Sequence, residues 1–246
     1  MEQVTLRPDQ LSGFYHKNFV DRQLSDYRLL AEDGALVPSS VVDVGGGCGF
    51  FALGLESSGP YEVTVLDADV NALSEARTHG VTGILGDALA PPDDLSADVI
   101  CFNLILHHLV GENDDITEKL QRGALEAWRD KTRTIFINEY IYESLLEGFS
   151  ARIIFEITRS RILSRMAKAI SRLVPSLKAN TFGVGVRFRT TADWLKIFDR
   201  AGLRVAGYVR GREEFVSLGR KTLGITSCRR DSFLLRWKNE HSSLKA

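Results

Sequence analysis

The sequence predicts an α/β fold built on a mostly parallel sheet of seven strands with helices on both faces. Short apolar, β-branched runs alternate with segments of helical periodicity, which is the pattern of repeated strand–helix–strand units. The first of these runs ends in a corner with a glycine at every second position, Gly45, Gly47 and Gly49. A chain of 246 residues is long enough for one such domain with an insertion.

The elements follow one another in a regular order. Residues 10–36 have helical spacing, and a strand at 41–45 leads through the glycine corner into a helix at 49–58. That helix is expected to stop at Ser57-Ser58-Gly59-Pro60. The other predicted elements are a strand at 62–67, a helix at 70–79, strands at 81–85 and 97–104, a helix at 116–130, a strand at 134–139, a helix at 190–201, and strands at 203–208 and 233–237.

The glycine corner has the chemistry of a ligand loop. Glycine allows the backbone to turn sharply and to pass close to a ligand. The backbone N–H groups at the start of the next helix are then available to an anionic group. Asp43, just before the corner, adds a carboxylate that can accept hydrogen bonds from a cationic or hydroxyl-bearing ligand.

The pattern Asp43-x-Gly45-x-Gly47-x-Gly49 resembles motif I of class I S-adenosylmethionine (SAM)-dependent methyltransferases. The looser nicotinamide or flavin fingerprint, GxGxxG/A, also matches residues 47–52. The acid two residues before Gly45 favours SAM. The resemblance implies a Rossmann-like sheet whose last two strands pair antiparallel, and SAM as the cofactor.

Two further acids lie where the resemblance expects them. Asp67 ends the second strand, where a carboxylate would accept both ribose hydroxyls. Asp87 follows a short strand and would accept from the adenine amino group. Asp67 could instead cap the next helix, and Asp87 could be a turn residue before Pro91-Pro92. Together the motifs imply this cofactor-binding set: Asp43, Gly45, Gly47, Gly49, Asp67, Ala68, Asp87, Ala88 and Asn103.

The candidate catalytic residues are His107, His108 and Glu139. The Leu106-His107-His108-Leu109 pattern after the fourth strand is similar to that of plant-type O-methyltransferases, in which a histidine here is the general base. The chain departs from that group in having Leu109 for a tryptophan and in lacking its N-terminal dimerisation domain. The histidines could instead cap the following segment or contact the cofactor, and Glu139 could bind the acceptor or orient a histidine.

Residues 143–186 are an insertion of about forty residues in a place where this fold needs only a short connection. They contain a basic amphipathic helix, which ends at Pro175. We expect this helix to cap the substrate pocket; a dimer contact, a membrane-surface helix and simple packing on the core are the alternatives. Arg187 and Arg189 would point the same way and could clamp a carboxylate or phosphate of the substrate, and Tyr15 could lie over the cofactor.

Charge is divided unevenly along the chain. Residues 1–150 hold 25 acidic and 10 basic side chains, whereas residues 151–238 hold 6 and 20. We expect the second part to face an acidic partner or to lie against the acidic first part; solvated arginine faces that pair internally are the alternative. The three cysteines have no metal-binding spacing, so no metal is expected and a reduced, cytoplasmic setting is the simplest interpretation. Cys48 and Cys101 are expected to be buried.

These observations divide the chain into an N-terminal helical cover (1–40), a SAM-binding core (41–142), a helical cap (143–186) and the C-terminal part of the sheet (187–246). The predicted function is methyl transfer from SAM to a small-molecule acceptor, acidic or carrier-bound, in specialised metabolism. The alternatives are an RNA or protein methyltransferase and a non-catalytic partner subunit with a SAM fold. The sequence has no aromatic interleaving of its basic residues, which argues against nucleic acid, and no apolar run that could span a membrane. The sequence is compatible with a homodimer and does not determine the oligomeric state.

Overall fold

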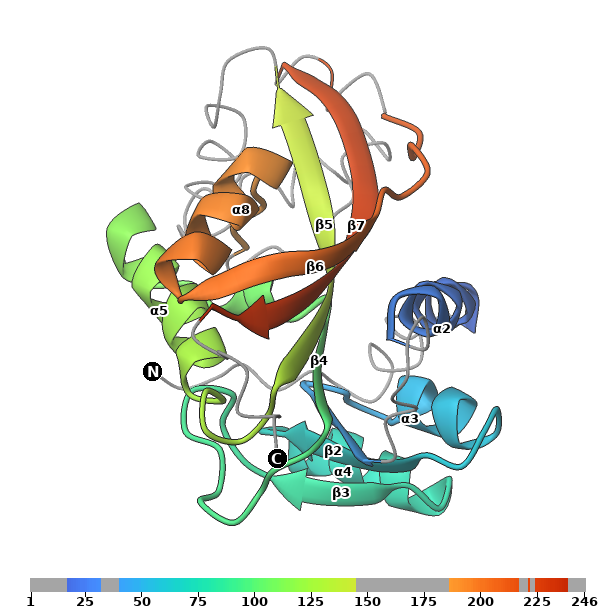
Figure 1. Ribbon diagram of the computed structural model, residues 1–246. Helices are drawn as coiled ribbons and strands as arrows, with labels where there is room; N and C mark the ends of the chain where they lie inside the picture. Colours follow the sequence, from blue (N-terminus) through green and yellow to red (C-terminus); the bar gives the residue numbers. More distant parts are fainter. Residues whose placement is uncertain (1–16, 32–39, 145–185, 217–220, 222–223, 239–246) are drawn as a thin grey trace, which may run out of the picture.

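The computed structural model of the chain contains one seven-stranded sheet in the order β3-β2-β1-β4-β5-β7-β6 (Figure 1). The residues that it describes are 17–31, 40–144, 186–216, 221 and 224–238. Tyr15 and nearly all of the predicted cap at 143–186 lie outside these residues.

The strands alternate with helices as the sequence predicts. In chain order the strands are β1 (Ser40–Val44), β2 (Glu62–Asp67), β3 (Thr82–Leu85), β4 (Val99–Asn103), β5 (Thr134–Ser144), β6 (Leu203–Val209) and β7 (Ile225–Trp237). The helices are α2 (Lys17–Ala31), α3 (Phe50–Glu56), α4 (Val70–Thr78), α5 (Asp114–Glu126) and α8 (Thr191–Arg200), with a single 3₁₀ turn, η1 (Leu106–His108), after β4.

Strands β3, β2, β1, β4 and β5 are parallel, and β7 lies between β5 and β6 and runs antiparallel to both. The predicted α/β class, the mostly parallel sheet and the antiparallel ending are therefore confirmed. Several helices begin with a side-chain cap, as amphipathic surface helices commonly do. Asn113 accepts from the N–H of Ile116 at the start of α5, and Thr190 and Asp193 form a reciprocal capping box at the start of α8.

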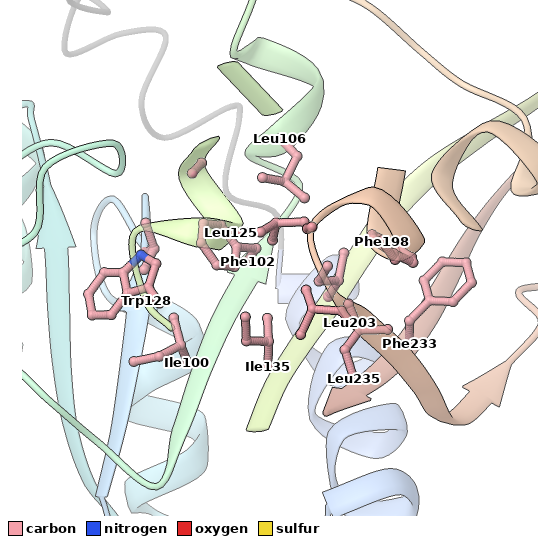
Figure 2. Packing of buried hydrophobic residues seen from close by; sticks show 14 of the residues in the cluster. Ile100, Phe102, Leu106, Leu125, Trp128, Ile135, Phe198, Leu203, Phe233 and Leu235 are labelled. Atoms are coloured by element: carbon pink, nitrogen blue, oxygen red, sulfur yellow. The ribbon is translucent and has the colours of Figure 1, made fainter. Parts of the chain in front are cut away.

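Helices cover both faces of the sheet. The largest apolar cluster lies between one face and helices α5 and α8, where Phe102, Leu125 and Phe198 are fully or almost fully buried (Figure 2). A second cluster joins the other face to α2, α3 and α4, and includes Tyr27 and Cys101. Cys48 and Cys101 are both buried, as predicted. The helices in the described part of the chain are all too short or too polar to cross a bilayer.

Strands β5 and β7 are longer than the sequence predicts and rise as a ribbon beyond the rest of the sheet (Figure 1). The first half of β7 contains Arg229, Arg230 and Asp231, a pattern typical of an exposed loop. Arg229 and Asp231 are buried, however, because their charges pair with each other at 3.0 Å. Arg229 also pairs with Glu143 of β5 at 3.2 Å. Internal pairing thus allows charged residues to form a buried strand.

Helix α2 is attached to the sheet by buried polar groups as well as by apolar packing. Gln23 donates to Asn138 of β5 at 3.4 Å, and Asn138 donates to Ser232 of β7 at 2.8 Å. The Ser232 hydroxyl in turn donates to Asp26 of α2 at 2.8 Å. Because Asn138 pairs in register with Asn103 of β4, these contacts hold α2 beside the carboxyl end of the central strands.

Candidate cofactor and catalytic site

The candidate site lies at the carboxyl ends of β1 and β4. From β1 the chain proceeds outward to β2 and β3, whereas β4 and β5 lie on the other side of β1. Loops leaving β1 and β4 therefore diverge, and open parallel sheets bind ligands in the crevice that such a divergence creates. The glycine corner leaves β1 here, and Asn103 ends β4.

The glycine corner has the backbone conformation that its sequence predicts. Gly45, Gly47 and Gly49 have φ angles of 69°, 56° and 76°, a region that side chains with a Cβ rarely occupy. The intervening Gly46 passes so close to Asp43 that a Cβ there would lie 2.4 Å from Oδ2 of Asp43. The corner thus brings the backbone down onto the Asp43 carboxylate.

Asp43 and Asn103 form a buried polar pair across β1 and β4. The Asn103 side-chain amide donates to Oδ1 of Asp43 at 3.0 Å. The other oxygens, Oδ2 of Asp43 and Oδ1 of Asn103, are buried and accept no hydrogen bond. Burial raises the pKa of Asp43 from 3.8 to about 7, and the charge of Asp67 adds to the increase, while the hydrogen bond from Asn103 opposes it. Two adjacent buried acceptors without donors fit a ligand that carries an ammonium group.

Asp67 ends β2 on the other side of the glycine corner. Its Oδ2 accepts from the N–H of Gly47 at 2.9 Å and its Oδ1 from the N–H of Asp69 at 2.8 Å. Burial is the main cause that raises the pKa of Asp67. The N-cap of α4 is Asp69, so the alternative role of Asp67 as a helix cap is wrong. Asp67 instead fixes the corner to the end of β2, with its neighbour Ala68 exposed.

Asp87 and Ala88 lie beyond β3 in a tight turn. Oδ1 of Asp87 accepts from the N–H of Leu89 at 2.9 Å, which is the turn geometry that the sequence allowed as an alternative. Ala88 packs against the main core cluster. Sequence reasoning missed two apolar residues at the same edge, Leu85 and Val70, which are each 57 % exposed. Leu85 pairs in register with Asp67, and no sequence signal marks it as different from any other strand residue.

The structure brings His107 and Glu139 into direct contact. Nδ1 of His107 lies 2.7 Å from Oε2 of Glu139, and both side chains are buried. Oε1 of Glu139 accepts from the backbone N–H groups of Leu106 and His107, at 2.7 Å and 3.3 Å. A carboxylate that faces Nδ1 holds the proton on that nitrogen, which leaves the lone pair on Nε2. The contact with Glu139 thus fixes the His107 ring through its Nδ1 atom.

His108 is the neighbour of His107 in η1, and the two ring centroids lie 4.1 Å apart. Burial lowers the pKa of His108 well below 6.5, and the adjacent His107 lowers it further. His108 is therefore neutral at physiological pH. The chain passes into η1 through Leu104, whose φ of 57° is unusual for a residue with a side chain. η1 then lies against β5, where Glu139 accepts from two of its backbone N–H groups.

Arg187 and Arg189 point the same way, as predicted, but toward carboxylate and amide partners within the protein. Arg187 donates to both oxygens of Asp114, at 2.8 Å and 3.1 Å, and Arg189 donates to Gln121 at 2.6 Å. Both arginines are buried. Together with the pair Arg200–Glu118, these contacts show basic side chains of the second part lying against the acidic first part of the chain. Among the residues that the structure describes, no group of three or more His, Cys, Asp or Glu side chains could hold a metal ion.

Comparison with known proteins agrees with this geometry. Residues 42–125 match the family model described as a methyltransferase domain. No curated protein sequence matches the chain. Among solved structures, magnesium protoporphyrin IX methyltransferase from Synechocystis PCC 6803 with bound SAM has a TM-score of 0.56 at 13 % identity, over 95 % of this chain and 86 % of that one.

Two longer proteins are similar over part of their length. Mitomycin 7-O-methyltransferase MmcR has a TM-score of 0.53 at 15 % identity and matches 88 % of this chain and 54 % of its own. LepI, solved with SAH and a substrate analogue, has a TM-score of 0.53 at 14 % identity over 85 % of this chain and 46 % of its own. The chain thus spans about half the length of these two relatives. Its sheet order and glycine corner give the chain the fold of these structures, and residues 42–125 match a methyltransferase domain.

Proposed function

We propose that the chain transfers a methyl group from SAM to a hydroxyl of a small-molecule acceptor, with His107 as the general base. The observation that carries this proposal is the contact of 2.7 Å between His107 Nδ1 and Glu139 Oε2, in the turn that follows β4 and Asn103. Methyl transfer itself needs no added electrophile, since the bound sulfonium supplies an activated methyl group and a neutral leaving group. The protein must position the acceptor, exclude water and remove a proton.

Groups at this edge of the sheet would match three parts of the cofactor: its ammonium group, its ribose and its adenine ring. Asp43 and Asn103 supply the unpaired acceptors for its ammonium group. Asp67 lies at the end of β2, where its remaining lone pairs would face the ribose hydroxyls. The exposed apolar side chains of Val70 and Leu85 offer an apolar wall for the adenine ring.

The chemical step balances with these groups. The acceptor oxygen forms a bond to the methyl carbon as the sulfur–methyl bond breaks and the sulfur keeps the electron pair. The hydroxyl proton goes to Nε2 of His107, and the Glu139 carboxylate stabilises the imidazolium that forms. The uneven distribution of charge along the chain favours an acidic or carrier-bound acceptor. Such an acceptor would need basic groups beside the cofactor. Arg187 does not supply one, because Asp114 and the carbonyl of Phe188 occupy its guanidinium.

Binding and turnover test the proposal separately. Calorimetry with SAM and S-adenosylhomocysteine (SAH) should give micromolar affinity, and Asp67→Ala should weaken it strongly. No binding by the wild-type chain would leave the partner-subunit alternative. Incubation with SAM and metabolite extracts, with mass detection of a gain of about 14 daltons, should then identify the acceptor. If the chain binds RNA in a salt-dependent manner and methylates it, the small-molecule assignment is overturned.

A further inference from the structure

The backbone of η1, which carries His107, is held by groups from β5, from α5 and from the segment before α8. Two of its N–H groups donate to Glu139 of β5, as described above. The carbonyl of Leu106 accepts from the side-chain amide of Gln121 in α5 at 3.0 Å. The carbonyl of His107 accepts from the N–H of Arg187 at 2.9 Å. The turn is therefore fixed by contacts that are distant in sequence.

Gln121 acts on the peptide group that joins Leu106 to His107. The C=O of this peptide accepts from Gln121, and its N–H donates to Glu139. A planar peptide that is held at both ends has a fixed orientation, and this orientation sets the direction of the Cα–Cβ bond of His107. Gln121 and Glu139 thus hold the same peptide from opposite sides.

The Gln121 side chain is itself fully engaged. It is completely buried, and its Oε1 accepts from Nε of Arg189 at 2.6 Å while its Nε2 donates to Leu106. An amide that is buried without partners is costly, and apolar residues would fill this inward face of α5 more simply. The neighbouring inward residues Ala124 and Leu125 are indeed apolar. The contacts of Gln121 therefore connect Arg189 to the turn that carries His107.

We propose that Gln121, oriented by Arg189, is a positioning residue for the His107–Glu139 pair. This inference rests on the proposed function, because it treats His107 as the base. Without the Gln121 amide, the Leu106 carbonyl keeps only the hydrogen bond of 3.1 Å from the N–H of Leu109, within the turn itself. The Leu106–His107 peptide is then held less firmly against α5, and the alignment of Nδ1 of His107 with Glu139 weakens. Gln121→Met keeps the length and approximate volume of the side chain but removes both hydrogen bonds.

The matched control is Thr132→Val. Thr132 is also buried, and its hydroxyl makes hydrogen bonds of 3.0 Å to the carbonyls of Asp98 and Thr134. It lies two residues before β5, at the opposite end of the strands from η1, which follows the end of β4. Both variants therefore lose buried hydrogen bonds, but only Gln121→Met loses those that reach the His107 turn.

The quantity to measure is the rate at which the Nδ1 proton of His107 exchanges with solvent, by NMR. The full chain is labelled with ¹⁵N-histidine and saturated with SAH, and the signal of His107 is assigned by its absence in His107→Asn. We expect this proton to exchange with solvent about tenfold faster in Gln121→Met and to be unchanged in Thr132→Val. Equal exchange in the wild type and Gln121→Met would overturn the inference, and so would equal acceleration in both variants. If circular dichroism shows that Gln121→Met does not fold, Gln121→Asn, whose amide is too short to reach Leu106, replaces it.

A kinetic comparison separates this inference from the proposed function. With the acceptor found by mass detection, Gln121→Met should lower kcat about tenfold and leave the KM for SAM unchanged. Full turnover by His107→Asn would overturn the role of His107 as base. Faster proton exchange in Gln121→Met would still show that Gln121 positions the ring.

Discussion

The side-chain amide of Asn103 donates a hydrogen bond of 3.0 Å to Oδ1 of Asp43 and thereby joins the ends of β1 and β4 beneath the glycine corner. The pair keeps two buried oxygens without donors, one on each residue. With its pKa raised to about 7, the carboxyl of Asp43 is poised between its neutral and ionised forms at physiological pH. If Asp43 holds the cofactor ammonium group as proposed, its charge state links cofactor binding to pH.

Affinity for SAH should increase with pH through about 7. A ligand ammonium group favours the ionised form of Asp43, so below pH 7 binding must first release the Asp43 proton. We expect the affinity to fall roughly tenfold for each pH unit below 7. Calorimetry between pH 5.5 and 8.5 measures this slope, using about 0.5-unit steps. Asp67 also has a raised pKa, so Asp43→Asn is the control that isolates Asp43; it should bind weakly with a flatter profile.

The stability of the ligand-free chain should show the opposite dependence. The pKa of Asp43 is higher in the folded state than the unfolded value of 3.8, so folding takes up a proton between pH 3.8 and about 7. The contribution of this group is therefore most favourable below pH 3.8 and is lost as the pH rises to 7. Asp43→Asn should be more stable than the wild type at pH 8, by up to about 4 kcal/mol, and the difference should shrink toward pH 4. Urea unfolding at both pH values measures it; a constant difference would contradict the assignment.

His107→Asn should reduce turnover at least about a hundredfold, because the acceptor hydroxyl loses its base. SAH affinity should be unchanged, since the cofactor groups lie on β1, β2 and β4. His108→Asn is the matched control: His108 is the adjacent histidine in the same turn, but its pKa lies well below 6.5. Initial rates with the identified acceptor distinguish the two. A larger loss in His108→Asn would transfer the role of base to that residue.

Glu139→Gln tests the partner of the base. Glutamine keeps an oxygen for the N–H groups of η1 but removes the charge that stabilises a protonated His107. If its NH₂ group faces Nδ1, the imidazole must adopt the other tautomer and Nε2 carries the proton. We expect kcat to fall between about tenfold and a thousandfold, with the KM for SAM unchanged. An active Glu139→Gln enzyme with wild-type kcat would show that the carboxylate is not needed.

How far the sequence predicts this structure depends on whether a contact is local. The strand at 62–67 and the sharp turn at Gly45, Gly47 and Gly49 were predicted, because alternation and glycine spacing directly reflect local backbone geometry. The start of β7 was not predicted, because charged residues such as Arg229 and Asp231 are typical of a loop. Only the structure shows that they pair with each other. Pairing between distant residues has no local signal.

The same distinction applies to the site. Glu139 was a candidate to bind the acceptor or orient a histidine, and its contact with His107 fits the second role. It lies inside β5, however, and not at the end of that strand as the sequence predicts. Arg187 and Arg189 were predicted to bind the substrate. In the structure they contact Asp114 and Gln121 instead, which belong to a helix more than sixty residues earlier in the chain. Gln121 was missed altogether, because a glutamine in a helix normally indicates an exposed face.

Gly46→Ala and Gly80→Ala should separate the glycine corner's role in binding from ordinary backbone strain. At Gly46 a Cβ would lie 2.4 Å from Oδ2 and 2.8 Å from Cγ of Asp43, so the carboxyl group or the corner must move. At Gly80 a Cβ would meet nothing within 4 Å, but the φ of 81° is unfavourable for alanine. Gly80→Ala should therefore cost about 1 kcal/mol of stability and leave SAH affinity unchanged. Gly46→Ala should weaken SAH binding at least about tenfold, since the acceptors of Asp43 and Asn103 lose their alignment. Urea unfolding and calorimetry on the same samples measure both effects, and wild-type affinity in Gly46→Ala would place the ligand away from Asp43.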